Sequence, residues 1–212
     1  SIASDSNLGG GTVSLAGATA LSITGDDATI DNAITLTGNA TINAAANATI
    51  SGSIGGNFDL TKAGIYTLTL TGTNTYTGST HINGGALSIV DDTNLGVGVI
   101  NLGMASSTLA VTGSGTIDNN MALTGSATLQ VASDLTWSGA ISGNNILNKK
   151  GAGVLTLSAT NTATGALTVS EGTLLVTGSI VNATNVAGGA TLGGTGTVGN
   201  IVTVQNGGTL AP

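Results

Sequence analysis

The sequence predicts an all-β protein, wound as a single-stranded parallel β-helix (a solenoid) of about nine or ten coils. Three observations predict the solenoid: short alternating runs that end in turn residues, an internal repeat of about 87 residues, and a core composition of small aliphatic side chains. Hydrophobic residues make up 40% of the 212 residues, yet aromatic residues make up only 2%, which suits a narrow core.

Short runs along the whole chain alternate apolar residues with hydroxyl-bearing ones, the period of a strand with one buried and one wet face. The clearest are residues 12–15, 20–24, 67–71, 86–89 and 154–158. Most runs end in Gly, Asn-Gly or Asp-Asp, which tolerate tight corners. No window has convincing helical periodicity, so strands and corners account for the chain.

The chain aligns with itself, almost without gaps, when it is shifted by about 87 residues. Close to half of the aligned positions from residue 29 to residue 89 are identical. We therefore treat 1–212 as a single solenoid segment made of copies 1–87 and 88–174 and a partial third copy, 175–212. Each full copy is expected to make about four coils of about 22 residues. An antiparallel sandwich, the other all-β fold considered, gives no reason for such a repeat.

Asparagines recur at equivalent predicted corners of the two copies. We expect them to stack and hydrogen-bond along the axis, as amide ladders do. The set is Asn32, Asn57, Asn74, Asn119, Asn144 and Asn161. In the alternating runs, Leu21, Leu70 and Leu157 are expected to face the core.

Composition excludes several classes of protein. A net charge of −7, with three lysines and no arginine, excludes binding to nucleic acid by neutralising phosphates. Polar residues interrupt every apolar run, so no segment provides the roughly 18 apolar residues of a membrane-spanning helix. Without cysteine there is no disulfide, zinc–thiolate site or thiol nucleophile. No leader pattern opens the chain, so we expect a mature or internal region of a longer protein.

The ionisable residues predict no catalytic, cofactor or metal site. His81 is the only candidate general base, and because Thr168 takes its place in the second copy, we expect an exposed strand histidine. Ser114, in the run 112–115 (TGSG), is expected at a solenoid corner and not at a nucleophile turn. Lys62 and Lys149 occupy equivalent positions and are expected to have a structural role at a corner.

Two acidic pairs, Asp26-Asp27 and Asp91-Asp92, are expected to cap corners through backbone N–H groups. A weak calcium contact is the alternative, although the usual calcium-loop patterns are missing. The threonine-rich run 67–77 raises an ice-binding interpretation, which requires threonines in register on adjacent coils. The sequence predicts that this run recurs only at the 87-residue period, which disfavours ice binding.

Four aromatic residues could supply platforms for stacking sugars: Phe58, Tyr66, Tyr76 and Trp137. Trp137 takes the place of Ile50 of the first copy, so it is expected to fill a wider part of the core or a sheet face.

Residues 60–87, LTKAGIYTLTLTGTNTYTGSTHINGGAL, resemble the passenger-associated repeat of bacterial autotransporters, and residues 147–174 resemble it more loosely. The second segment keeps Lys149, Gly151, Gly153, Leu155, Leu157, Asn161 and Gly165. The tail from Gly188 is similar to the linking coils of these passengers. The resemblance implies a right-handed parallel β-helix, exported and displayed at the outer membrane of a Gram-negative cell. It also implies that the repeat assists passenger secretion and folding.

We therefore expect a non-enzymatic structural segment of a secreted, surface-displayed autotransporter passenger, serving as a rigid stalk or adhesin fibre. Its expected partners are receptors or glycans on host or bacterial surfaces, neighbouring coils of its own chain, or further copies joined end to end. Nucleic acid is not expected as a partner, and the segment is not expected to span a membrane. Two alternatives stay open: a carbohydrate-active β-helix enzyme with a groove of acidic corners, and a self-associating filament subunit.

Overall fold

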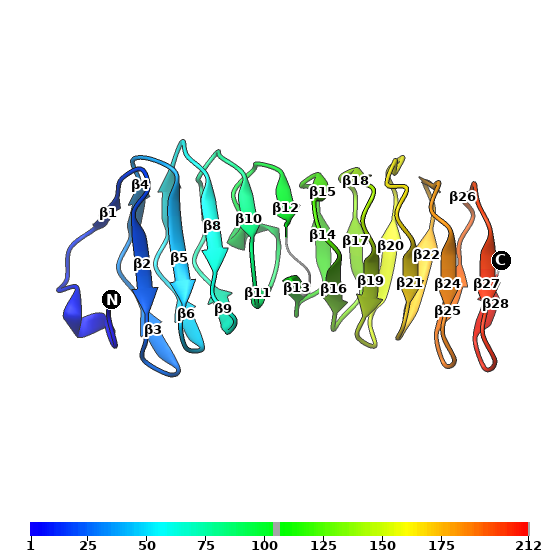
Figure 1. The fold of residues 1–212 in the computed structure, drawn as a ribbon, viewed down its shortest axis with the longest axis horizontal. Coiled ribbons are helices and arrows are strands. Elements are labelled where there is room, and N and C mark those ends of the chain that lie inside the picture. Colours follow the sequence, from blue (N-terminus) through cyan, green and yellow to red (C-terminus); the bar gives the residue numbers. More distant parts are fainter. Residues whose placement is uncertain (104–106, 212) are drawn as a thin grey trace.

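In a computed structural model the chain forms one rod of stacked parallel turns, and the structure describes residues 1–103 and 107–211 (Figure 1). Every strand pair between described residues is parallel and in register, which rules out the antiparallel sandwich. The described residues contain no α-helix, only two 3₁₀ turns, η1 (Asp5–Asn7) and η2 (Asp92–Asn94). The predicted all-β solenoid is confirmed. Pro212, at the end of the predicted third copy, lies outside the described residues.

Each turn contributes to three faces of the rod. The first face is a seven-stranded sheet. Its strands are β2 (Ala20–Ile23), β5 (Ala40–Ala44), β8 (Leu60–Ala63), β10 (Thr80–Ile82), β12 (Ile100–Leu102), β15 (Met121–Leu123) and β18 (Ile141–Gly143). Hydrogen bonds from the N–H of Thr162 to the carbonyl of Ile141, and from the N–H of Asn161 to the carbonyl of Ser179, continue this face. It ends in β23 (Ser179–Ile180) and β26 (Thr197–Val198).

The second face is a ten-stranded sheet that runs along most of the rod. Its strands are β3 (Ala28–Ile30), β6 (Ala48–Ile50), β9 (Thr67–Leu70), β11 (Ala86–Ile89), β13 (Ser107–Val111), β16 (Ala127–Val131), β19 (Leu147–Lys150), β21 (Leu167–Val169), β24 (Thr184–Val186) and β27 (Val202–Val204).

The third face consists of two sheets separated by irregular backbone. The first sheet contains β1 (Val13–Leu15), β4 (Ile34–Leu36) and β7 (Ile54–Gly56). The second contains β14 (Gly115–Ile117), β17 (Leu135–Trp137), β20 (Val154–Leu157), β22 (Thr173–Val176), β25 (Thr191–Gly193) and β28 (Thr209–Ala211). Between them, the N–H of Thr75 bonds to the carbonyl of Ile54 and the N–H of Val97 to that of Tyr76, so the turns stay stacked without regular strands.

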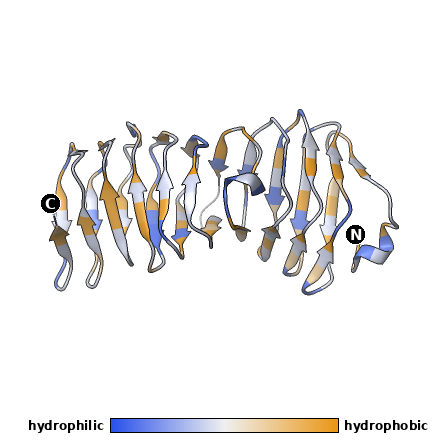
Figure 2. Ribbon diagram, turned by 180° about the vertical axis from the view of Figure 1, so that it is seen from behind, coloured by the Kyte–Doolittle hydropathy of each residue, from blue (hydrophilic) through white to orange (hydrophobic). Residues whose placement is uncertain are grey.

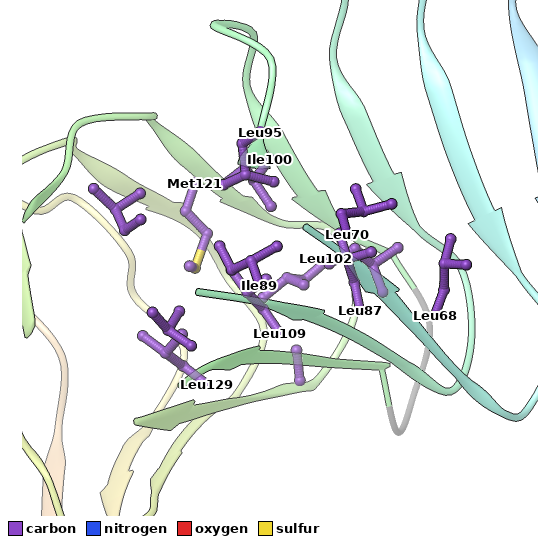
Figure 3. Packing of buried hydrophobic residues seen from close by; sticks show 14 of the residues in the cluster. Leu68, Leu70, Leu87, Ile89, Leu95, Ile100, Leu102, Leu109, Met121 and Leu129 are labelled. Atoms are coloured by element: carbon purple, nitrogen blue, oxygen red, sulfur yellow. The ribbon is translucent and has the colours of Figure 1, made fainter. Parts of the chain in front are cut away.

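The core fills the space between the three faces with aliphatic side chains. Because neighbouring side chains on a strand point to opposite faces, every second residue of most strands is buried. Leu21, Leu70 and Leu157 are buried, as predicted. Leucines also stack in register, as in the column Leu68, Leu87, Leu109 and Leu129 on four successive strands (Figure 3). Apolar colour therefore alternates with polar colour along the strands (Figure 2).

The turn is shorter than predicted, and this changes how the two copies are related. Ala28 pairs with Ala48 and Ala48 with Leu68, so a turn takes about 20 residues, and the expected value of about 22 is wrong. An offset of about 87 residues then makes four and one third turns, not four. Each strand of the first copy has its equivalent one face further round in the second. Thus β8 and β9, on the first and second faces, correspond to β19 and β20, on the second and third.

The winding is right-handed. In Figure 1 the strands β2, β5 and β8 run downwards on the near side while the chain advances from the N-terminus to the C-terminus, left to right. This agrees with the handedness that the family resemblance implied.

The asparagine ladder is not formed. Asn32, Asn74, Asn119 and Asn161 are buried at corners, but Asn57 and Asn144 are exposed. The buried amides bond to the backbone of neighbouring turns: the side-chain oxygen of Asn74 accepts from the N–H of Ile54 at 2.7 Å, and that of Asn161 from Ile141 at 2.8 Å. Equivalent asparagines lie four and one third turns apart, so they cannot stack on one another.

Candidate functional site

A buried lysine ties two turns together at a corner of the first copy. Lys62 lies on β8, its side chain is fully buried, and its ammonium donates to three backbone carbonyls. These belong to Gly64 at 2.7 Å, Tyr66 at 2.6 Å and, one turn further along, Gly84 at 2.8 Å. Three donors meet three acceptors, so the ammonium is satisfied without a carboxylate. We call this arrangement a lysine clamp.

The second copy repeats the clamp on another face. Lys149 of β19 is also fully buried, and its ammonium donates to the carbonyls of Gly151 at 2.6 Å, Gly153 at 2.6 Å and Glu171 at 2.9 Å. Each acceptor occupies the position in the second copy that an acceptor of Lys62 occupies in the first. The corner glycines Gly64 and Gly151 have φ of +84° and +83°, a conformation that glycine adopts without strain.

Burial disfavours the charged form of both lysines. It lowers the pKa of Lys62 to about 8 and the pKa of Lys149 to about 8, and for Lys149 the carboxylate of Glu171 opposes the shift. Each carbonyl triad is therefore needed to hold a charge inside the rod. The geometry suits a structural fastening and agrees with the corner role predicted for both residues.

His81 lies on β10 with about a third of its side chain exposed, as predicted for a strand histidine. Its Nε2 is 3.7 Å from the carboxylate of Asp59, which also accepts a hydrogen bond from the N–H of Ser79 at 2.8 Å. On the same face, Thr61 and Asn101 flank His81 in register. Ser114 lies at the corner between β13 and β14, not before a helix. Neither residue is placed in a nucleophile–base arrangement.

All ten acidic residues lie outside the strands. Asp91 caps η2 through the N–H of Thr93 at 2.9 Å, as predicted for a corner carboxylate. Asp92 instead reaches the N–H of Asp118 at 3.3 Å, and its pKa is raised by burial and by the neighbouring charges of Asp118 and Asp91. No group of three or more His, Cys, Asp or Glu side chains that could hold a metal ion occurs among the described residues.

The equivalent contact in the first copy joins Asp5 of η1 to Asp31. The N–H of Asp31 donates to the carboxylate of Asp5 at 3.2 Å. A side-chain hydrogen bond to Asp5, followed by its negative charge, raises the pKa of Asp31. Both copies therefore bring two carboxyl groups together where a 3₁₀ turn meets a corner. Asp26 and Asp27 take no part in this contact. Neither carboxylate accepts a hydrogen bond from a backbone N–H of the described residues, so the capping predicted for this pair is wrong.

The expectation that the threonine pattern recurs only at the period of the long repeat is wrong. Because a turn takes about 20 residues, Thr29, Thr49 and Thr69 lie in register on β3, β6 and β9. Ser88 continues the row on β11, and Ala110 interrupts it on β13. The second face of the first copy therefore carries a row of hydroxyl groups on adjacent turns.

The four aromatic residues divide into two buried and two exposed. Trp137 is fully buried and fills the core, one of its two predicted positions. Tyr76 is also fully buried, with its hydroxyl 2.6 Å from that of Thr80, so it cannot act as a sugar platform. Phe58 and Tyr66 remain 41% and 43% exposed at corners. Sequence reasoning could not separate these pairs, because burial at a corner depends on which neighbouring turn covers it.

Both lysine clamps lie inside segments that match one family model, the passenger-associated transport repeat, at residues 60–89 and 147–176. We refer to these two matched segments as transport repeats. Each transport repeat begins with the strand that carries the clamp lysine. It ends on the next turn, which contains a backbone carbonyl that accepts a hydrogen bond from that lysine. The resemblance predicted for residues 60–87 and 147–174 is confirmed.

Over 130 residues the chain is 36% identical to the "Adhesin BmaC autotransporter" of Brucella suis biovar 1 (strain 1330). That alignment covers 60% of this chain and 4% of the relative, so the chain spans a small part of the length of that protein. No solved structure matches the chain. No helix among the described residues is long and apolar enough to cross a membrane.

Proposed function

We propose that this chain is a non-enzymatic stalk segment of a secreted autotransporter passenger, displayed at the surface of a Gram-negative cell as part of an adhesin fibre. The observation that carries the proposal is the lysine clamp, present once in each transport repeat and fastening successive turns of a continuous parallel ladder. The relative that is named an adhesin autotransporter supports the surface setting.

The physical role follows from how a solenoid is stabilised. Each turn contacts only its neighbours, so stability and stiffness accumulate turn by turn, and the growing end templates the next turn. A buried ammonium that bonds to three carbonyls on two turns fixes the register of the turn that follows. Folding of a passenger outside the cell can then proceed turn by turn along the rod. The turns that have already folded keep the exported part of the chain outside the cell.

The proposal is tested in the complete surface protein by replacing both clamp lysines, Lys62→Met and Lys149→Met. Methionine keeps an unbranched side chain of similar length but cannot bond to the carbonyls, so the corners lose their fastening. We expect several-fold less protease-resistant passenger on intact cells. Lys150→Met, a change at the exposed lysine next to Lys149, is the matched control and should leave display unchanged. Wild-type display and protease resistance of the double variant would contradict the proposal.

A carbohydrate-active enzyme is the competing function. It would require carboxyl groups that converge on one substrate bond, whereas Asp26, Asp27, Asp91 and Asp92 belong to corners about three turns apart along the rod. We expect the purified chain to release no reducing ends from polysaccharides. If it does, and if replacing these four residues with asparagine abolishes the release, the stalk proposal is wrong.

A further inference from the structure

The second face of the first copy is hollowed where β3, β6 and β9 run side by side. The hollow has a volume of about 300 Å³ and is lined by Asp27, Asn47, Ala48, Thr49, Thr67 and Thr69. Five of these six residues are polar. We call this feature the threonine hollow.

The polar groups of the hollow are available to a ligand. Within the described part of the chain, the hydroxyls of Thr49, Thr67 and Thr69 donate no hydrogen bond, and nothing donates to the carboxylate of Asp27. Asn47 uses its oxygen to accept from the N–H of Thr67 at 3.1 Å, which turns its NH₂ group towards other partners. The hollow therefore offers hydroxyls that both donate and accept, an amide that donates and a carboxylate that accepts.

The spacing of these groups is regular. Thr49 and Thr69 are directly paired on adjacent strands, about 4.8 Å apart, and Thr67 and Thr69 point the same way from one strand, about 7 Å apart. Tyr66, which immediately precedes Thr67 at the corner before β9, is 43% exposed but is not among the residues that line the hollow. Closely spaced hydroxyl, amide and carboxylate groups are the chemistry that forms hydrogen bonds with the hydroxyl groups of a sugar.

The second copy shows that the fold does not require this combination. Four of the six equivalent positions hold other residues: Ser114 for Asp27, Asp134 for Asn47, Leu135 for Ala48 and Val154 for Thr67. The hydroxyl of Thr67 and the amide of Asn47 therefore have no counterpart in the equivalent part of the third face, and its carboxylate lies at a different position. In addition, Asp27 has a φ of +54°, which is unusual for a residue other than glycine, whereas no such value occurs at Ser114.

The charge of the molecule narrows the class of ligand. With a net charge of −7, no arginine and a carboxylate in the hollow, the site disfavours acidic sugars. A single carboxylate is also too few for a calcium site, which takes six or more oxygen ligands, usually with several carboxylates among them. We propose that the threonine hollow is a binding subsite for a neutral, hydroxyl-rich oligosaccharide. The proposal deepens the adhesin role and rests on it for its biological setting.

The test uses the purified chain, so that its failure is distinct from a failure of surface display. The probes are maltohexaose, cellohexaose, mannohexaose and N-acetylated chitohexaose, with sialyllactose as the acidic comparison. Binding is followed by amide chemical shifts in two-dimensional NMR spectra. We expect at least one neutral hexasaccharide to shift the amides of residues 47–49 and 66–69, and sialyllactose to shift none of them.

The variant for the hollow is Thr49→Val with Thr69→Val, which removes two hydroxyls but keeps side-chain shape and strand propensity. Its matched control is Thr136→Val with Thr156→Val, the equivalent pair on the third face. We expect the hollow variant to weaken binding about tenfold or more and the control to bind as the wild type does. Thr67→Val, which copies the residue of the second repeat at this position, should also weaken sugar binding.

Three outcomes would overturn the proposal: no shift with any neutral hexasaccharide, shifts confined to another surface, or equal losses in the hollow variant and its control. Equal or tighter binding of sialyllactose would overturn the assignment to neutral sugars. Thermal unfolding of each variant distinguishes a lost contact from a lost fold.

Discussion

The two copies of the repeat have similar sequences and different surroundings. Copy 1–87 sets its clamp lysine on the first face, whereas copy 88–174 sets it on the second, one third of a turn further round. Nevertheless, the two ammonium groups bond to equivalent carbonyls at closely similar distances: 2.7, 2.6 and 2.8 Å for Lys62, and 2.6, 2.6 and 2.9 Å for Lys149. The contacts of a clamp lysine in this rod are therefore set by the turns before and after it, and not by the face on which it lies.

The comparison separates residues that hold the turns together, which are the same in both copies, from surface residues that differ between the copies. The clamp lysines, the buried asparagines and several corner glycines are the same in both copies. The exposed aromatic residues, His81 and most of the residues of the threonine hollow are not. The following predictions test that division.

The largest expected effect is the loss of a clamp. Lys62→Ala should lower the free energy of unfolding by about 4 kcal/mol, because it leaves a cavity and three carbonyls without their donor. Lys149→Ala should lower it by a similar amount, within about 1 kcal/mol, because the contacts are equivalent. Urea unfolding at pH 7 measures both. Lys150→Ala should change it by less than about 0.5 kcal/mol. A large difference between the free energies of unfolding of the two clamp variants would mean that the stability a clamp provides depends on the face on which it lies.

A second pair of variants tests the corners. A Cβ on Gly52 would lie 2.0 Å from the carbonyl oxygen of Asn32, and one on Gly139 2.0 Å from that of Asn119. Backbone must move in both cases, so Gly52→Ala and Gly139→Ala should each cost about 3 kcal/mol. Nothing lies near a Cβ on Gly10, so Gly10→Ala should have little effect. Chemical unfolding of the three variants ranks them, and tolerance of either corner alanine would count against close stacking there.

The pH dependence of stability tests the buried charges. Because the pKa of each clamp lysine is about 8 in the folded chain and 10.5 without burial, the unfolded chain binds more protons between these values. The free energy of unfolding should therefore rise with pH between 8 and 10, by up to about 1 kcal/mol per pH unit for each lysine. The variant Lys62→Met with Lys149→Met should lose this slope. A wild-type slope that is flat or negative would show that the carbonyl triads outweigh burial.

The smallest effect concerns the paired carboxyl groups. Asp5→Asn should lower the pKa of Asp31, because it removes the charge that helps to raise it. Asp118→Asn should lower the pKa of Asp92 less, because burial, the larger cause there, stays. Carboxyl-carbon NMR titration follows each group. Equal changes in the pKa of Asp31 and the pKa of Asp92 would indicate that the two carboxyl groups do not differ in burial.

The sequence was sufficient for the fold class, the strands and the repeat, because alternation and self-similarity are visible in one dimension. It was not sufficient for the turn length. Turns of about 20 and of about 22 residues both fit the long repeat, and only pairings such as that of Ala48 with Leu68 decide between them. The error about the threonine row follows from that one quantity, because it fixes which residues become neighbours. The threonine hollow was missed for the same reason, since its residues come from successive turns that lie far apart in the sequence.

The position of the carboxylates has a consequence for two such rods that lie side by side. All ten acidic residues lie outside the strands, so negative charge follows the edges of the rod while the sheet faces carry mostly neutral hydroxyl and amide groups. Two rods that approach side by side meet a repulsive edge within about 10 Å at moderate ionic strength. Lateral association of two rods through their exposed sheet faces is therefore disfavoured by the charge along their edges.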